Sequence, residues 1–194
     1  MKKIAIILYT ALTLLSIASC TDLKEEVLNE QDESETISDT THAGSIVAPA
    51  YAYLRDLQSR SGVWLVLESL TDEMVFPTRG TDWNYPNYRT LFTHEYDSKN
   101  TYIKNTWNSF MLGITKCNVA LQYLTKLEQT EEVKNYVNET LFIRALCMYH
   151  LMDCFGHFPM REYTETDYSK LPVILEREQA LNRIITELET IIPQ

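Results

Sequence analysis

Hydrophobic residues recur most regularly between Tyr102 and Leu127, where alternating steps of four and three mark one face of a long helix. The residues on this face are Ile103, Trp107, Phe110, Ile114, Cys117, Leu121 and Leu124. A second stretch of this kind runs from Glu131 to Phe155, after a short polar turn. Gly156 suits the position just past a helix, and Pro159 prevents the helix from resuming. The pattern predicts a long antiparallel helix hairpin, the unit of tetratricopeptide-like stacks.

Shorter helical patterns precede the hairpin. Apolar residues recur at helical spacing from Ile46 to Leu57, and Asp39 or Thr40 fits the capping position. Pro49 lies inside this stretch, so we expect the helix to kink there or to start late. A further apolar stretch, Trp64 to Phe76, is expected to be helical until the proline that follows it.

The remaining stretches complete an all-α prediction. Arg79 to Asn100 holds a glycine, a proline, three asparagines and five aromatic residues, which is typical of a long loop. A final helix is expected over about Glu176 to Ile192. Strand alternation is not strong anywhere in the chain. We therefore expect one helical domain over residues 38–194.

The beginning of the chain has the pattern of a lipoprotein signal. Lys2 and Lys3 precede an apolar run, Ile4 to Ile17, and small residues lead directly to Cys20. The run is shorter than the roughly 20 residues that a spanning helix needs. We expect residues 1–19 to be removed, Cys20 to carry acyl chains such as palmitate, and residues 20–37 to form an acidic tether. The alternative is an ordinary cleaved signal in which the cysteine is incidental.

Charge limits the partners of the protein. The formal net charge is −10, and loss of the two lysines in residues 1–19 makes it −12. Such a charge repels nucleic acid and disfavours electrostatic contact with an anionic membrane, so lipid is the expected attachment to a membrane. The other cysteines, Cys117, Cys147 and Cys154, form no C-x-x-C pair and are expected to be small buried residues.

Signatures of metal binding and catalysis are weak. His150, Asp153 and His157 are spaced three and four residues apart, but a glycine interrupts the helix before the last of them. We interpret them as ordinary helix-end residues. Asp72 and Glu73 are adjacent, whereas glycosidase carboxylates must face one another across a sugar. We expect no metal, no cofactor and no enzymatic activity.

Two polar residues fall on apolar helix faces. Asn118 follows Ile114 by four residues, so its amide is expected to hydrogen-bond to neighbouring backbone. Arg144 is expected to be buried and therefore to need a carboxylate partner, for which Glu68 and Asp72 are the candidates.

Residues 79–88 combine aromatic rings, amides, an acid and an arginine where helix packing does not require them. Sugars present apolar C–H faces and a rim of hydroxyls, so a flat ring with Asp, Asn and Arg side chains around it can hold them. The alternative is an aromatic loop folded onto the helices as a plug. Composition favours neither interpretation.

Several segments, in order, resemble the SusD/RagB family of nutrient-uptake lipoproteins. They are the signal with Cys20 and its acidic run, Glu68–Glu73, Arg79–Trp83, the Trp107–Leu124 helix, Arg144–Tyr149, Asp153–Pro159 and Ile184–Leu188. The resemblance covers nearly the whole chain.

This resemblance implies a tetratricopeptide-like (SusD-like) fold that captures glycans at the cell surface, seated as a lid on a SusC-like TonB-dependent outer-membrane transporter. The residues that it suggests for glycan binding are Trp83, Asn84, Arg79, Asp82, Tyr85 and Asp72. Family members usually continue further, so the chain is expected to correspond to their amino-terminal part. A competing hypothesis is a helical scaffold that binds peptides or protein subunits at the cell surface.

Overall fold

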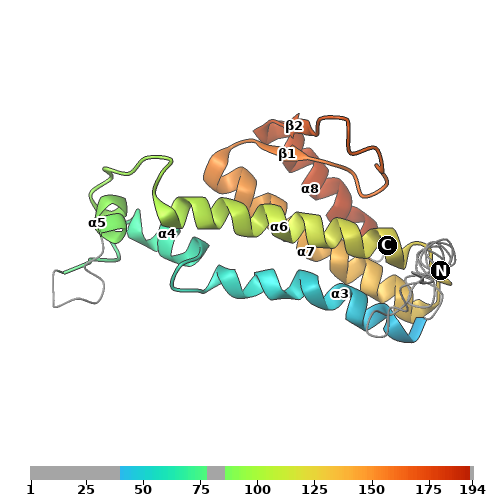
Figure 1. Ribbon diagram of the computed structural model, residues 1–194. Helices are drawn as coiled ribbons and strands as arrows, with labels where there is room; N and C mark the ends of the chain where they lie inside the picture. Colours follow the sequence, from blue (N-terminus) through green and yellow to red (C-terminus); the bar gives the residue numbers. More distant parts are fainter. Residues whose placement is uncertain (1–39, 78–85, 193–194) are drawn as a thin grey trace, which may run out of the picture. The chain divides into compact units, whose positions relative to one another are not determined.

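The computed structural model describes residues 40–77 and 86–192 (Figure 1). The helices are α3 (Ala43–Tyr51), α4 (Val63–Ser69), α5 (Pro86–Phe92), α6 (Thr101–Leu124), α7 (Glu131–Phe155) and α8 (Arg177–Ile191). The strands are β1 (Phe158–Met160) and β2 (Val173–Leu175), and the 3₁₀ helices η1 (Thr40–His42) and η2 (Ala52–Leu57) flank α3. The long helices α6 and α7 lie side by side, α3 packs against both, and α8 packs on α7.

The predicted hairpin is confirmed, and its ends have clear physical causes. The side chain of Asn100 accepts hydrogen bonds from the backbone N–H groups of Tyr102 and Ile103, which caps α6. Thr130 caps α7 through the N–H of Val133. Gly156 ends α7 with a φ of 80°, a conformation that glycine adopts without a Cβ clash.

The main core lies between the hairpin and its neighbours. Its largest buried members from α6 and α7 include Phe110, Ile114, Ile143, Met148 and Leu151. The predicted face of α6 is buried or half-buried throughout. Since the helices dominate, the protein has the expected all-α class of fold.

The structure corrects the prediction for the first helix. Pro49 lies inside α3 without delaying its start, and the chain tightens into 3₁₀ geometry from Ala52. A proline has no N–H for the helical hydrogen-bond ladder, which weakens the last α-helical turn. The N-cap of α3 is His42, whose side chain does not cap the helix, and Thr40 lies in η1. Asp39 lies outside the described residues.

The next helix is shorter than predicted. α4 ends at Ser69, well before Phe76. The hydroxyl of Thr71 donates to the carbonyl of Glu68 and accepts from the N–H of Glu73. These local bonds compete with helical ones and turn the chain away.

The predicted long loop contains α5. Pro86 is the first residue of this helix, a position where its fixed φ is favourable and its missing N–H costs nothing. Tyr88 and Leu91, three residues apart, are buried on one face. The prediction of a continuous loop was wrong here, because a proline can begin a helix as well as end one.

The two strands were also missed by the sequence pattern. β1 and β2 pair antiparallel, with Phe158 opposite Leu175 and Met160 opposite Val173. Each strand has three residues, which is too short for an alternating pattern to be recognised. The segment between them, residues 161–172, arches back over α6.

Candidate functional site

A column of aromatic rings lies at the base of the candidate loop. Phe76 precedes the 78–85 segment and Tyr88 follows it, and their rings stack at a centroid distance of 5.5 Å. Tyr88 in turn stacks on Tyr102 of α6 at 4.5 Å. The backbone on both sides of the 78–85 segment is therefore anchored to the same helix.

Hydrogen bonds of two asparagines strengthen this base. The amide of Asn100 donates to the carbonyl of Asn87 at 3.0 Å and to the hydroxyl of Thr90 at 3.1 Å. The amide of Asn87 donates to the hydroxyl of Thr101 at 2.8 Å. These bonds join α5 to the start of α6. In this half of the predicted loop, the amides of Asn87 and Asn100 and the ring of Tyr88 therefore hold the fold together.

The other half of the predicted loop holds most of the candidate glycan-binding residues. Arg79, Asp82, Trp83, Asn84 and Tyr85 lie outside the described residues, as does Cys20.

Asp72, by contrast, is described. It is exposed in the turn that follows α4, close in sequence to the aromatic base. Its carboxylate is thus exposed to solvent and available to a ligand.

A hollow of about 290 Å³ lies between α4, the turn before α6 and the end of α7. Its walls are mainly apolar, with Leu67, Leu70 and Phe155 among them, and Tyr96 and Asp97 lie at the same hollow. An apolar lining with a few polar groups is usual for small-ligand pockets.

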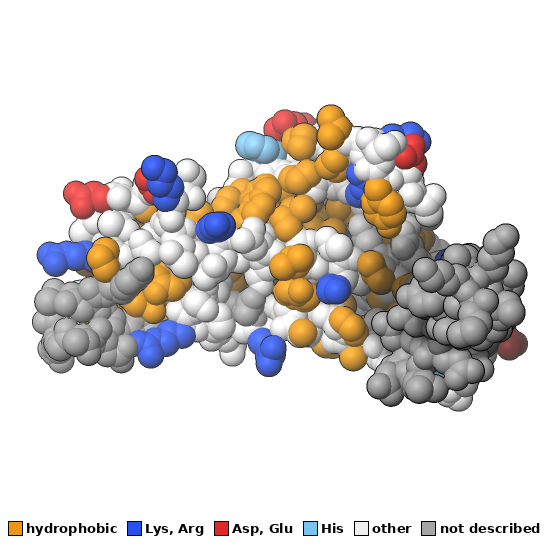
Figure 2. Space-filling view, viewed as in Figure 1, with side chains coloured by type: hydrophobic (Ala, Val, Ile, Leu, Met, Phe, Trp, Pro, Cys, Tyr) orange, Lys and Arg blue, Asp and Glu red, His pale blue; other side chains and the backbone are white. Residues whose placement is uncertain are grey.

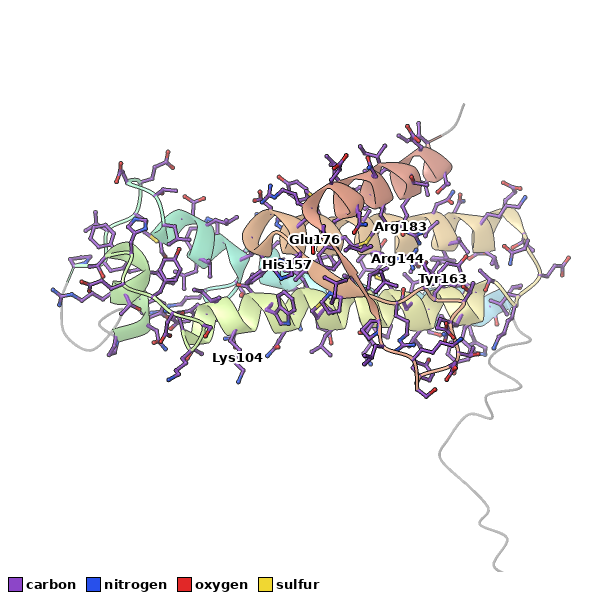
Figure 3. The ribbon with its side chains drawn as sticks, turned by 90° about the horizontal axis from the view of Figure 1, so that it is seen from above. Lys104, Arg144, His157, Tyr163, Glu176 and Arg183 are labelled. Carbon is purple, nitrogen blue, oxygen red and sulfur yellow. The ribbon has the colours of Figure 1, made fainter. Side chains whose placement is uncertain are left out.

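The polar residues on the apolar faces form one network around Arg144, which is labelled in Figure 3. As predicted, Asn118 hydrogen-bonds to backbone: its amide donates to the carbonyl of Arg161 at 2.8 Å. Its side-chain oxygen accepts from Arg144, which is buried with 1% of its surface exposed. The guanidinium of Arg144 also lies over the ring of Tyr163, at 5.2 Å from the centroid.

The carboxylate partner of Arg144 is Glu187 of α8, so the expectation of Glu68 or Asp72 was wrong. Two nitrogens of Arg144 donate to the two oxygens of Glu187, at 2.6 and 3.1 Å. α8 covers this side of α7, whereas α4 packs against α6 and α5. A signal existed in the sequence, because Glu187 follows the buried Ile184 by three residues and therefore shares its helix face.

His150 and the three cysteines Cys117, Cys147 and Cys154 belong to the packing, whereas His157 is exposed. The ring of His150 stacks on Phe110 at 4.9 Å, and burial lowers the pKa of this histidine. Cys117 and Cys147 are buried free thiols, and burial raises the pKa of Cys147 to about 12. Over residues 40–77 and 86–192, no three His, Cys, Asp or Glu side chains are grouped so that they could hold a metal ion.

These features define an all-α protein of the tetratricopeptide-like class. A sequence model of the SusD-like family, described as "starch-binding associating with outer membrane", matches residues 26–192. The chain belongs to this family, whose described role is glycan binding associated with the outer membrane. Neither the curated proteins nor the solved structures contain a significant match. Within the part of the chain that the structure describes, none of the helices has the length and apolar character needed to cross a bilayer.

Proposed function

We propose that the protein is a surface lipoprotein that binds glycans and passes them to a partner SusC-like TonB-dependent transporter for nutrient uptake. The family match over residues 26–192 is the observation that carries this proposal, because it includes all the described helices and the candidate loop. The role is that of a binding protein and not of an enzyme.

Glycan binding is assigned to the 79–85 segment together with Asp72. The stacked rings of Phe76, Tyr88 and Tyr102 support this assignment, since they fix the chain on both sides of the segment. A site with ordered flanks loses less conformational entropy when a ligand binds. In this proposal Trp83 stacks on the sugar ring.

In this proposal a lipid anchor holds the binding domain at the membrane. Attachment is through acyl chains on Cys20, which the acidic residues 20–37 join to the helical domain. Replacing Cys20 by serine is expected to move the protein from the outer-membrane fraction to the soluble fraction and to remove its palmitate label. Unchanged fractionation of Cys20→Ser would contradict lipid anchoring.

The glycan proposal is tested by calorimetric titration of the full-length protein with a panel of oligosaccharides that includes the starch fragment maltoheptaose. We expect Trp83→Ala to weaken binding at least tenfold, which corresponds to about 1.4 kcal/mol. The matched control is Trp64→Ala, which removes a partly exposed tryptophan of α4. Equal affinity of Trp83→Ala and the wild type would remove the loop from the site.

The competing function, a scaffold for peptides, has support from the mainly apolar hollow beside Leu67 and Phe155. A random peptide library serves as the second titrant. Capture of peptides without any binding of oligosaccharides would favour this alternative over the glycan proposal.

A further inference from the structure

A second cavity lies far along the chain from the candidate loop. It has a volume of about 250 Å³ and is enclosed between α6 and the 161–172 segment that joins β1 to β2. The floor is apolar, with Ile114 and Val119 of α6. The polar lining comes from Gln122 of α6 and from residues of the segment, including Glu162 and Glu165.

The segment that covers this cavity is held in place by Arg161. Its guanidinium donates to the backbone carbonyls of Asp167, at 3.0 Å, and of Lys170. The carbonyl of Arg161 accepts from the amide of Asn118, which ties the same residue to α6. The cavity is therefore preformed, and a ligand does not have to order its wall.

An aromatic ring is displayed at the cavity in a fixed orientation. Tyr168 lines the cavity while 69% of its surface is exposed. The guanidinium of Arg161 lies at 5.4 Å from the centre of its ring, a cation–π contact that restricts the movement of the ring. An ordered, exposed ring of this kind provides the flat apolar surface on which a sugar ring can stack.

The polar groups at the cavity suit a neutral ligand with hydroxyl groups. Within the described residues, the side-chain amide of Gln122 makes no hydrogen bond, so its donors and acceptor are available. The carboxylate of Glu162 forms an ion pair with the guanidinium of Arg183 at 2.5 Å. The carboxylate of Glu165 forms one with the ammonium group of Lys170 at 3.7 Å. Because both carboxylates have cationic partners, the cavity does not favour a basic peptide.

We propose that this cavity is a second carbohydrate site, separate from the 79–85 loop, that takes one sugar residue of a longer glycan. The apolar face of the sugar stacks on Tyr168, and its hydroxyls bond to Gln122 and to the carboxylate oxygen of Glu162 that does not face Arg183. The volume is just below the roughly 300–1,000 Å³ of pockets for drug-sized ligands, which fits a single sugar residue.

A neighbouring hollow gives the rest of the glycan a path. It has a volume of about 510 Å³ and shares Arg161, Glu162, Glu165 and Pro172 with the first cavity. A chain can therefore continue past Leu171, which is itself 90% exposed. The choice of a glycan as the ligand rests on the proposed function, whereas the position of the site rests on the cavity alone.

The test is calorimetric titration of the full-length protein with maltoheptaose, comparing wild type, Tyr168→Ala, Gln122→Ala and Trp83→Ala. Tyr149→Ala is the matched control, because Tyr149 is an exposed tyrosine of α7 that does not line this cavity. We expect Tyr168→Ala to weaken one binding event at least fivefold and Gln122→Ala at least threefold. Thermal melting of each variant verifies that it is folded, and the exposed Tyr168 can be removed without opening the core.

The outcomes separate the two proposals. If Trp83→Ala abolishes binding while Tyr168→Ala and Gln122→Ala bind like the wild type, the second site is refuted and the loop site stands. If Tyr168→Ala alone loses an event, the second site stands and the loop assignment fails. Absence of any glycan binding by the wild type overturns both, and binding of a peptide at Tyr168 in its place overturns the carbohydrate assignment.

Discussion

The ion pair between Arg144 and Glu187 offers the sharpest test of how the helices are held together. The proposed change is Glu187→Gln, which keeps the shape of the side chain and removes its charge. One oxygen remains to accept from Arg144, but an NH₂ group now faces the donors of the guanidinium. The buried arginine is then left without its counter-charge.

The structure sets the size of the effect. Arg144 is 1% exposed and Glu187 is 4% exposed, so neither group can turn to water. Breaking a buried pair by removal of one partner costs about 3–5 kcal/mol. A domain of this length loses roughly 2–4 °C of melting temperature per kcal/mol, so the melting temperature is expected to fall by about 6–20 °C. Arg183 also donates to Glu187 at 2.8 Å, but in the variant it still has its ion pair with Glu162. The expected loss therefore lies toward the lower end of this range.

Urea denaturation and thermal melting of the full-length protein, followed by circular dichroism at 222 nm, measure this loss. Glu189→Gln is the matched control, since it removes one charge from an exposed position of the same helix. A double variant, Arg144→Met with Glu187→Leu, removes both charges. We expect it to be more stable than Glu187→Gln alone, because no unpaired charge remains buried.

The reasoning is refuted if Glu187→Gln costs no more than the control, that is, less than about 1 kcal/mol. It is refuted equally if the double variant is the less stable of the two by several kcal/mol. The first result would mean that the pair behaves as a solvated one, and the second that the remaining hydrogen bonds of the network outweigh the cost of an unpaired buried charge.

Three further predictions concern pH, capping and thiol reactivity. Burial lowers the pKa of His150, so the unfolded chain binds its proton more readily; the stability contributed by the neutral form is complete above about pH 6.5 and is lost as the pH falls below it. His150→Phe is therefore expected to reduce the fall in melting temperature between pH 7 and pH 5. Asn100→Ala is expected to lower the free energy of unfolding in urea by about 1–2 kcal/mol, since it removes the cap of α6. Cys117 and Cys147 are expected to resist iodoacetamide at pH 8 in the folded protein and to react in urea, because burial raises both of their pKa values, that of Cys147 to about 12.

Each of these has a clear contrary result. Identical pH profiles of His150→Phe and the wild type would exclude the histidine as the source of acid sensitivity. A loss of less than about 0.3 kcal/mol in Asn100→Ala, against an exposed control such as Asn108→Ala, would mean that water replaces the cap. Rapid labelling of Cys147 in native protein, matching the rate in urea, would contradict its burial.

The hairpin could be predicted from the sequence because its cause is local. A helix face repeats every few residues, and both long helices carry caps and stops within a few residues of their ends: Thr130 and Gly156 bound α7. The same logic placed Asn118, which is half-buried, and Arg144, which is buried, on the apolar faces of their helices. Their burial follows from the spacing on their own helices, without any knowledge of the partner elements.

The identity of the partners could not be predicted in the same way. Glu187 meets Arg144 because α8 folds onto α7, a contact between residues that are 43 positions apart. The pairing of β1 with β2 likewise depends on distant segments of only three residues each. For the candidate site, the sequence indicated the 79–85 residues but gave no indication of the cavity under Tyr168, whose lining comes from α6 and the 161–172 segment together.

The space-filling view shows apolar side chains over the middle of the molecule, between the hairpin and the β1–β2 region (Figure 2). Exposed members in that part of the chain include Leu112, Val119 and Ile174. Single exposed apolar residues are normal on protein surfaces.

The stacked rings of Phe76, Tyr88 and Tyr102 have a consequence for how such a protein can diversify. Because the chain is already fastened on both sides of residues 78–85, lengthening that stretch twofold adds only about 0.6 kcal/mol of closure entropy. That stretch can therefore change in length and composition at little cost to the stability of the helices that flank it.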